Sequence, residues 1–518
     1  MPAAVAAAVT VAGTIGAAVL GAVGVAVAAT STLAIVVGAV LVVGTVALAT
    51  RAIKRARQRK LAEAGAAGAG AGGSTIASAL VTKTGSSVPI PLVYGQRRIS
   101  GQRVFIASDG EKNNYLHIIE SLCEGPVEGM TAIYFNDQEV ATSSDNGATW
   151  DWDITVEDDE ISYLNNVEVI FKDGSQTAAL NSETLTLDGE TINIHADWAG
   201  TTKVGNDTAY IYMVMKWDQD KFGGGKPNVT YLVKGKKVPA IGSAYDSAAS
   251  YSDEPARILY DYLINPNYGK GIPYTLIDAA SFNASATYNS EQVDATSTDS
   301  TQVTRYTCNA YVDTAQPLLE NVEDFLTTMR GGLITGDKYQ LIQDKPRNTS
   351  GVVHINDDRV IGSIKYLQAN KKTLMNALRA KFPDPSGDYN YQENITIVES
   401  PVLQSASYDG LKLKQDLELP YTADRNMVDR ILTEEINQSR QSGILEVTID
   451  PSNIDLTVGD VVKFSNETLG QTEKFYRITK TILKPDHTLE LNMREYDDNV
   501  YWDNNKDIIV NNKDDTDH

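Results

Sequence analysis

The chain has 518 residues, of which 42% are hydrophobic, and it carries a formal net charge of −22. This length allows about three to five domains with hydrophobic cores. Two cysteines exclude a disulfide scaffold, and the acidic balance argues against a general nucleic-acid-binding surface. We expect Cys123 and Cys308 to be small buried side chains.

The charge is unevenly distributed along the chain. Residues 1–73 contain six basic residues and one acidic residue and therefore carry a charge of +5. Because the whole chain carries −22, residues 74–518 carry −27. The first charged side chain is Arg51, and the fifty residues before it are almost entirely Ala, Val, Gly, Ile, Leu, Thr and Ser. Such a head must be buried in lipid, in a partner or in copies of itself.

The head contains two apolar runs, 3–29 and 33–50, which are separated by Thr30-Ser31-Thr32. We predict an apolar helical hairpin over residues 1–50. A helix needs about 20 apolar residues to cross a bilayer, so the first run is long enough and the second is marginal. The basic cluster follows the apolar run, whereas in a secretory signal it precedes it.

The composition of the head leaves three interpretations open: a membrane-inserting hairpin, a helix cluster packed inside an oligomer, and a disordered low-complexity segment. Small residues allow close helix packing, while Ala and Gly insert into membranes more weakly than Leu or Phe. The candidate residues of this membrane or lumen plug are Gly13, Gly16, Gly21, Gly24, Val36, Val37 and Leu41.

Residues 51–73 are a basic stretch followed by a Gly/Ala linker. The basic stretch favours either contact with anionic lipid headgroups or a solvated helix end. The residues 64–73 have the composition of a flexible linker. They do not form a phosphate-binding loop, because no strand precedes them and no Lys-Ser/Thr pair follows. The candidate headgroup contacts are Arg51, Lys54, Arg55 and Arg57.

From Ser74 the pattern changes to short runs of β-branched and aromatic residues, which are typical of strands. The two prolines within residues 88–95 predict an extended edge segment. The nearly continuous apolar run at 210–217 predicts a strand buried on both faces. Strands are predicted at 115–120, 132–136, 167–171, 209–217 and 228–233.

Four helices are predicted in the body. The clearest covers 253–264, with Asp253 as its N-cap and Pro255 near the first helical position. The Asn265-Pro266 pair ends it. The other predicted helices cover 318–329, 372–381 and 426–441. Alternating strands of a small β-domain follow at 444–464 and 475–493, before a polar tail.

The sequence contains no recognisable catalytic constellation. It lacks the phosphate-loop, His-Glu-x-x-His and Gly-x-Ser-x-Gly motifs. Residues 145–151 favour an Asn-Gly turn over a calcium loop, and the carboxylates at 157–160 favour a solvated loop over acid-base chemistry. We therefore expect no enzyme activity and no catalytic, cofactor-binding or metal-binding residue, and we expect Asp460 to serve a turn.

Several segments together resemble the phage lambda-like tail-tip (host-specificity) central hub family. Each segment alone is a weak signal, but their order and spacing across residues 88–495 strengthen the match. The segments are 88–98 (VPIPLVYGQRR), 120–129 (ESLCEGPVEG), 225–238 (GKPNVTYLVKGKKV), 258–271 (ILYDYLINPNYGKG), 307–312 (TCNAYV), 341–346 (LIQDKP) and 458–462 (VGDVV).

The resemblance implies a mainly β fold with α+β inserts, in which several tail-tube-like β-barrel hub domains accompany the apolar helical segment. Longer members continue into receptor-binding domains, so receptor recognition is expected to lie in another protein. The predicted division is 1–50 (apolar hairpin or plug), 51–73 (basic stretch and linker), 74–245 (β-rich hub domain), 246–345 (helix-strand hub domain), 346–443 (α+β hub domain), 444–496 (small β-domain) and 497–518 (polar tail).

The resemblance also implies partners and a location. The chain would form a homotrimer that closes the distal end of a phage tail tube, after assembly in the host cytoplasm. It would contact other tail-tip, distal tail, tape-measure and fibre proteins, and DNA would pass without specific binding because the acidic body repels it. The head would plug the lumen and enter the host inner membrane during DNA delivery. Two alternatives remain: a membrane-anchored surface adhesin, and a cell-wall hydrolase carried at the tail tip.

Overall fold

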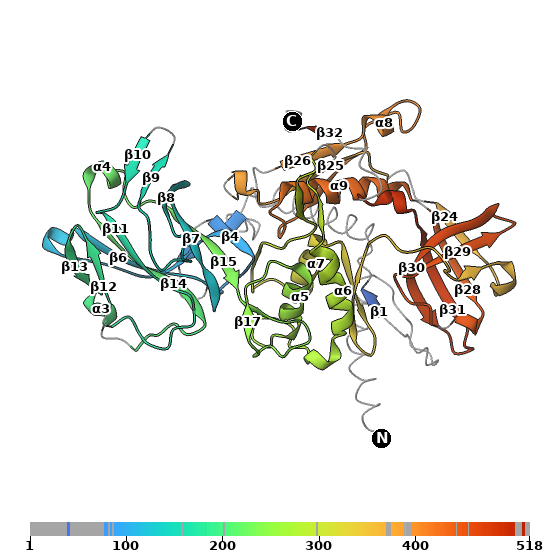
Figure 1. Cartoon of the computed structure of the whole chain (residues 1–518), viewed down its shortest axis with the longest axis horizontal. Helices are drawn as coiled ribbons and strands as arrows, with labels where there is room; N and C mark the ends of the chain where they lie inside the picture. The colour runs from blue at the N-terminus through green and yellow to red at the C-terminus, as the bar shows by residue number, and fades with distance from the viewer. Residues whose placement is uncertain are drawn as a thin grey trace, which may run out of the picture.

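The computed structural model describes residues 39–41, 77–80, 83–84, 88–156, 159–181, 183–199, 202–296, 299–368, 374–387, 389, 395–441, 443–453, 455–502 and 510–512. They form a β-rich lobe, a central region of helices and short sheets, and a C-terminal sheet. These three parts lie side by side along the longest axis of the molecule (Figure 1).

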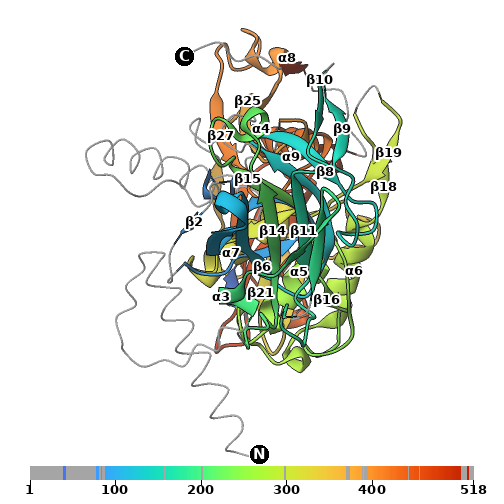
Figure 2. The ribbon, with the colours of Figure 1, turned by 90° about the vertical axis from the view of Figure 1, so that its left-hand side faces the viewer.

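Two sheets build the β-rich lobe. Their strand orders are β11-β14-β6-β5-β2 and β4-β15-β7-β8, and all neighbours are antiparallel except β2 and β5. In Figure 2 the strands β6, β14 and β11 of the first sheet lie side by side. The bounds are β2 (Lys83–Thr84), β4 (Gln96–Ser100), β5 (Gln102–Asp109), β6 (Tyr115–Glu124), β7 (Val127–Phe135), β8 (Gln138–Thr142), β11 (Val167–Lys172), β14 (Thr208–Lys216) and β15 (Val229–Lys236).

Strand β14 confirms the prediction of a strand buried on both faces. Ile211 and Met213 pack into a core shared with the second sheet, while Tyr212 and Val214 pack into a separate core on the opposite face. Smaller elements cover that opposite face or join the sheets: β9 (Asp153–Val156), β10 (Asp159–Ser162), β12 (Thr184–Leu187), β13 (Glu190–Asn193), α3 (Ala196–Ala199) and α4 (Gln219–Phe222).

The central region gathers its helices around one large core. This core extends from Leu92 of β3 to Ile436 of α9, so segments far apart in sequence share it. The bounds are β3 (Leu92–Tyr94), β16 (Val238–Pro239), β17 (Ala249–Ser250), α5 (Pro255–Ile264), α6 (Ala279–Asn289), β18 (Gln292–Asp294), β19 (Gln302–Thr304), β20 (Ala310–Val312), α7 (Leu318–Thr328), β21 (Gly331–Thr335), β22 (Tyr339–Gln343), β25 (Ala377–Lys381), β26 (Ile395–Glu399), α8 (Pro401–Gln404), β27 (Lys414–Glu418), α9 (Arg425–Arg440) and β32 (Val510–Asn512).

The C-terminal sheet has its own core and the strand order β23-β29-β30-β31-β28-β24. Buried and more exposed residues alternate along β28, as expected for a sheet with one face on a core. The bounds are β23 (His354–Ile355), β24 (Lys365–Gln368), β28 (Gly443–Ile449), β29 (Val461–Asn466), β30 (Gln471–Leu483) and β31 (Leu489–Glu495).

Three of the four predicted helices are confirmed as α5, α7 and α9. The N-cap of α5 is Glu254, whose carboxylate accepts from the backbone N–H groups of Ala256 and Arg257, and not Asp253. The helix predicted at 372–381 is wrong, because residues 377–381 form β25, which pairs with β26 and β27. A short apolar run fits a strand as well as a helix, and sheet partners decide between them.

The predicted fold class needs two corrections. No apolar N-terminal helix is present among the described residues: of the head they include only β1 (Ala39–Leu41), a strand antiparallel to β21. Backbone groups that pair with β21 are not available to a helix at these positions. The predicted closed β-barrels are replaced by open sheets, since none of the sheets in the described ranges closes on itself.

Both cysteines are buried and free, as predicted. Cys123 lies in β6, whereas Cys308 precedes β20 and does not lie within a strand. Burial raises the pKa of the Cys123 thiol to about 12. The turn at Asp460 is also confirmed. Its carboxylate accepts from the backbone N–H of Thr457, and Gly459, directly before Asp460, has a φ of 92°.

Candidate functional site

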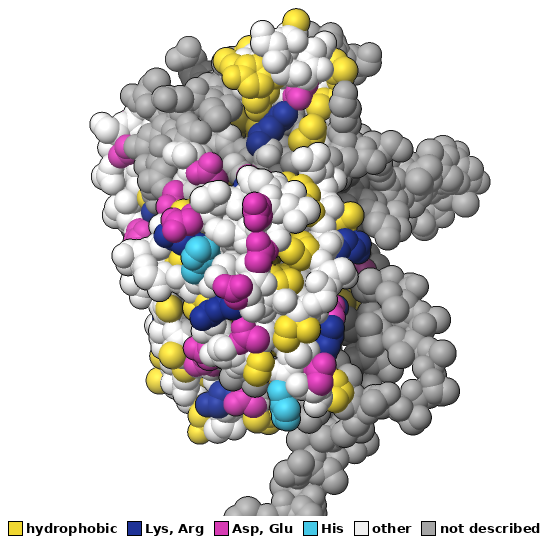
Figure 3. Space-filling view, turned by 90° about the vertical axis from the view of Figure 1, so that its right-hand side faces the viewer, with side chains coloured by type: hydrophobic (Ala, Val, Ile, Leu, Met, Phe, Trp, Pro, Cys, Tyr) yellow, Lys and Arg dark blue, Asp and Glu magenta, His cyan; other side chains and the backbone are white. Residues whose placement is uncertain are grey.

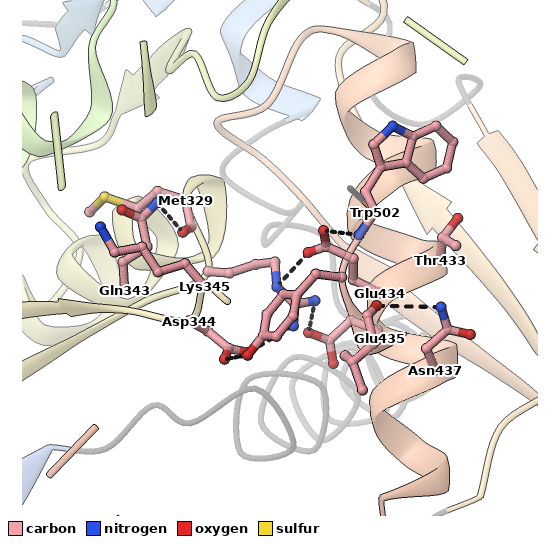
Figure 4. A network of polar contacts seen from close by, with 12 residues as sticks. Met329, Gln343, Asp344, Lys345, Thr433, Glu434, Glu435, Asn437 and Trp502 are labelled. Atoms are coloured by element: carbon pink, nitrogen blue, oxygen red, sulfur yellow. Dashed lines mark hydrogen bonds and ion pairs between the residues drawn. The ribbon is translucent and has the colours of Figure 1, made fainter. Parts of the chain in front are cut away.

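A group of buried charges lies where α7, β22, α9 and the C-terminal sheet meet. We call it the ionic junction. Glu434 and Glu435 project from α9 toward Asp344, which follows β22 (Figure 4). The ionic junction consists of Arg330, Asp344, Glu434, Glu435 and Arg477.

Arg330 is the centre of the ionic junction. Its guanidinium donates to Asp344 and Glu435 at 2.8 Å each, and its Nε lies 3.0 Å from Glu434. A planar guanidinium presents donors along several directions, so one side chain binds three carboxylates. Arg330 is 1% exposed, which means that these charges interact with little solvent screening.

The local sequence places Arg330 there. It follows the last residues of α7 and has a φ of 51°, which turns the chain directly into β21. For a residue with a Cβ this conformation costs about 1–2 kcal/mol. The Gly331-Gly332 pair directly after Arg330 is already extended and opens β21, opposite Gln343 and Ile342 of β22. The contacts of the guanidinium offset the backbone cost.

Asp344 connects the central region to the C-terminal sheet. It accepts from Arg330, from Arg477 of β30 and, at 2.7 Å, from the hydroxyl of Tyr501. Burial would raise the pKa of this carboxyl, but Arg477 and Arg330 outweigh burial and hold it well below the usual range. Asp344 is therefore a buried anion bound from two separate parts of the chain.

The two glutamates of α9 behave differently from Asp344. Burial outweighs the attraction of Arg330 and raises the pKa of Glu435 to about 7. Burial also raises the pKa of Glu434, although its carboxylate accepts from the backbone N–H of Trp502 at 3.0 Å. One arginine cannot compensate both neighbouring glutamates fully, because they also repel each other.

A second buried polar group joins the β-rich lobe to the central region. We call it the tyrosine junction: Tyr94, Lys236, Asp261 and Tyr268. Tyr94 of β3 and Tyr268 each donate a hydroxyl hydrogen bond to Asp261 of α5 at 2.7 Å. Lys236 of β15 donates to the carbonyl of Gly125 and lies over the ring of Tyr268. Burial raises the pKa of Asp261 despite these hydrogen bonds.

Both junctions are suited to holding parts of the chain together. Removing one partner of a buried ion pair typically costs about 3–5 kcal/mol, so the ionic junction resists separation of α9 from the C-terminal sheet. Within the described residues, no group of three or more His, Cys, Asp or Glu side chains is arranged to hold a metal ion. Nor does any helix in these residues combine the length and apolar character needed to cross a membrane.

Of the residues predicted for the head, the structure describes Leu41 alone. Leu41 lies in β1 opposite Leu333 of β21. The other predicted plug and headgroup residues lie outside the described residues: Gly13, Gly16, Gly21, Gly24, Val36, Val37, Arg51, Lys54, Arg55 and Arg57. Neither junction was predicted from the sequence. For the ionic junction, the signal that could have indicated it was the adjacent acidic pair Glu434-Glu435 within a predicted helix.

Comparison with known proteins finds similarity to one protein family over part of the chain. Residues 320–481 match the family model described as putative phage tail protein (Phage-tail_3). This stretch extends from α7 into β30 and contains all five residues of the ionic junction.

Two curated relatives are similar at low identity. The baseplate hub protein pb3 of Escherichia phage T5 is 21% identical over 471 residues, which cover 80% of this chain and 48% of pb3. The tip attachment protein J of Escherichia phage SECphi27 is 24% identical over 196 residues, or 34% of this chain and 16% of that protein. The chain thus spans about half the length of the T5 protein and a smaller share of the other.

One solved structure shares the fold over most of the chain. A chain in the virion of a native gene transfer agent particle aligns with a TM-score of 0.52 at 14% identity, covering 81% of this chain and 87% of that one. Together with the matches in sequence, this similarity leads to one conclusion. The chain is similar, at low sequence identity, to phage proteins described as tail, tip attachment and baseplate hub proteins, and it shares the fold of the gene transfer agent chain.

Proposed function

We propose that the chain is a structural tail-tip or baseplate hub of a long-tailed phage or a phage-derived particle. In this proposal three copies form a ring at the distal end of the tail tube, with residues 74–496 divided into hub domains as predicted from the sequence. The ring contacts distal tail, tape-measure and fibre proteins, and it assembles in the host cytoplasm. The lambda-like resemblance of the motifs supports the assignment to the tail tip.

The observation that carries the proposal is the extent of the similarity to the T5 baseplate hub protein. It covers 80% of this chain, so it includes parts on both sides of the ionic and tyrosine junctions and is not restricted to one module. The two junctions support a structural role, since the ionic junction joins the C-terminal sheet to the central region and the tyrosine junction places Lys236 of β15 over the ring of Tyr268.

The proposal also gives the apolar head a role. Residues 1–50 plug the lumen of the closed ring, and they enter the host inner membrane when DNA is delivered, with Arg51, Lys54, Arg55 and Arg57 at the lipid headgroups. The charge of −27 after residue 73 keeps the passing DNA from binding. A liposome flotation assay with the full chain tests membrane entry. If the chain does not float with the liposomes, the head does not enter membranes and its proposed role is limited to plugging the lumen.

The experiment that tests the hub function combines a gene deletion with labelling. Deleting the gene is expected to yield particles without a closed tail tip, and a complementing copy with an epitope tag is expected to bind gold-labelled antibody at the distal end of the tail. A surface adhesin would instead place the label on cell membranes. Intact, infective particles from the deletion strain would overturn the proposal.

A further inference from the structure

The described part of the head is held by the pairing of one strand. β1 lies antiparallel to β21, and the register places opposite one another Ala39 and Thr335, Val40 and Ile334, and Leu41 and Leu333. Among the described strands, β21 has β22 on its other side, so β1 covers its remaining edge. An edge strand presents a row of backbone N–H and C=O groups to any extended segment. Here the chain's own β1 occupies that edge.

The hairpin that presents this edge is fixed on its far side. The backbone N–H of Asp278, the N-cap of α6, donates to the carbonyl of Tyr339 in β22 at 2.9 Å. The N–H of Leu341 donates to the hydroxyl of Ser281 in α6 at 3.1 Å. Leu333 and Leu341 both belong to the large central core. Because the hairpin is already ordered by these contacts, β1 pairs with it at little further entropic cost.

The ionic junction closes the open end of the same hairpin. Arg330 directly precedes β21 and Asp344 directly follows β22. The backbone N–H of Asp344 donates to the carbonyl of Arg330 at 3.1 Å, and their side chains pair at 2.8 Å. Leu333, where the pairing with β1 ends, lies about 10 Å from Arg330 along an extended strand. The hairpin therefore carries the ionic junction at one end and the strand of the head nearby.

The C-terminal sheet holds Asp344 from outside the hairpin. Arg477 of β30 and Tyr501, which follows the last strand of this sheet, both donate to the Asp344 carboxylate. The sheet has a core separate from the central core. Its outer face carries interspersed acidic, basic and apolar side chains, as a solvated face does (Figure 3). A part with its own core opens as a unit, and such opening breaks the contacts that hold Asp344.

We propose that the β21–β22 hairpin is a latch that retains the apolar head, and that the ionic junction sets the strength of this latch. While α9 and the C-terminal sheet bind Arg330 and Asp344, both ends of the hairpin are fixed and β21 stays in register with β1. When the sheet separates from α9, β21 loses this support and β1 leaves its edge. The coupling is reciprocal, so release of β1 weakens the ionic junction by the same factor. The role of the released head in membrane entry rests on the proposed function.

The first experiment measures retention of the head in the full chain, with Val40→Cys and Ile334→Cys combined. Residues directly opposite in an antiparallel pair have Cα atoms about 4.5–5.5 Å apart, which a disulfide can bridge. Copper phenanthroline is the oxidant, and peptide mass spectrometry of mixed light and ¹⁵N-labelled protein is expected to show the bond within single copies. The control is Val40→Cys with Leu367→Cys, on β24 and 41% exposed. Equal bonding in the control, or no bond between residues 40 and 334 within a copy, would overturn the latch.

The second experiment tests the influence of the ionic junction. Arg330→Met is expected to accelerate backbone hydrogen exchange at residues 333–335 at least tenfold relative to Lys365→Met, and to slow formation of the 40–334 disulfide at least fivefold. Arg477→Met gives the same comparison with Arg330 intact, and a smaller acceleration is expected. Exchange in β14, in the β-rich lobe, is the internal reference and is expected to stay unchanged. Acceleration at 333–335 no greater than in β14 would overturn the coupling.

The third experiment connects the latch to membrane entry. The 40–334 cysteine variant is floated with vesicles of phosphatidylethanolamine and phosphatidylglycerol, once oxidised and once after reduction. The oxidised protein is expected to float at least fivefold less. Equal flotation of both forms would show that the head enters lipid without leaving β21; this would overturn the latch and leave the hub function standing. If neither form floats, membrane entry in the proposed function is wrong, and the disulfide and exchange results alone decide whether the latch exists.

Discussion

The ionic junction and the tyrosine junction perform the same structural task with different chemistry. The first attaches the C-terminal sheet to the central region through guanidinium and carboxylate groups. The second binds two tyrosine hydroxyls of the central region to one carboxylate, and Lys236 of β15 in the β-rich lobe lies over one of these tyrosine rings. Burying charge costs several kcal/mol per ion before the pairs offset it, whereas a neutral hydroxyl donor costs less. We therefore expect the two junctions to differ in how much they contribute to the free energy of unfolding and in how that contribution depends on pH.

The largest expected effect comes from Arg330→Met, which leaves three buried carboxylates without their shared partner. We expect the free energy of unfolding to fall by about 3–5 kcal/mol, measured by urea denaturation. Lys365→Met is the matched control, because Lys365 forms a single, exposed ion pair with Glu446. Its loss should be within about 1 kcal/mol. Equal effects of the two variants would show that burial does not strengthen the ionic junction.

The second prediction concerns pH and Glu435. Its folded-state pKa of about 7 lies above the ordinary value of 4.5, so its contribution to stability is present below pH 4.5 and is lost as the pH rises through 7. Glu435→Gln does not undergo this loss. Relative to wild type, the variant should therefore gain about 2–3 kcal/mol between pH 5 and pH 8. The measurement is urea unfolding of both proteins at several pH values.

Asp344→Asn serves as the control for that experiment, because the stability that Asp344 contributes is lost at low pH and not at high pH. The folded-state pKa of Asp344 is lowered, so its contribution is present above the ordinary value of 3.8 and is lost as the pH falls below it. The destabilisation caused by Asp344→Asn should be constant from pH 5 to pH 8. For each variant, the difference in the free energy of unfolding from wild type is plotted against pH. If it changed in the same direction for both variants, a raised pKa of Glu435 and a lowered pKa of Asp344 would be contradicted.

A smaller effect is expected at the tyrosine junction. Tyr94→Phe removes one of the two hydroxyl donors to Asp261 and should lower the free energy of unfolding by about 1–2 kcal/mol. Tyr274→Phe, at a residue that is 44% exposed, should change it by less than about 0.5 kcal/mol. If Tyr94→Phe matched Arg330→Met, the distinction between the two junctions would fail.

The smallest effect on folding is expected at Leu411, in the loop that follows α8. Leu411→Ser alters a side chain that is 56% exposed and should change the free energy of unfolding of the isolated copy by less than about 0.5 kcal/mol. A loss above about 1.5 kcal/mol, as in core substitutions, would indicate that Leu411 supports the fold of its own copy.

The sequence was informative where one pattern extended over a long segment. The nearly continuous apolar run at 210–217 predicted β14, and the stretch 426–441 was predicted as the helix that became α9, because segments of 9 and 16 residues leave few alternatives. Residues 377–381 were too short a run for that, and their partners in β26 and β27 decided the outcome. Helix α6 was missed because its Ala, Ser and Asn residues form no clear apolar face.

The junctions required information that local pattern does not contain. Arg330 meets Glu435 across 105 residues, and Tyr94 meets Asp261 across 167. A buried charge looks like a surface charge until its partner is known, and partners at this distance are set by tertiary packing. The motif that contains Asp344 was recognised as part of the family resemblance, but its role in binding Arg330 and Arg477 emerged only from the fold.

A cryo-EM reconstruction of the native particle tests the central claim most directly, which is that this chain is a rigid structural component of the tail tip. The result expected is several copies around the tail axis at its distal end, each with α9 and the C-terminal sheet joined at Arg330. Density for the chain elsewhere in the particle, or a C-terminal sheet detached from α9, would contradict the account.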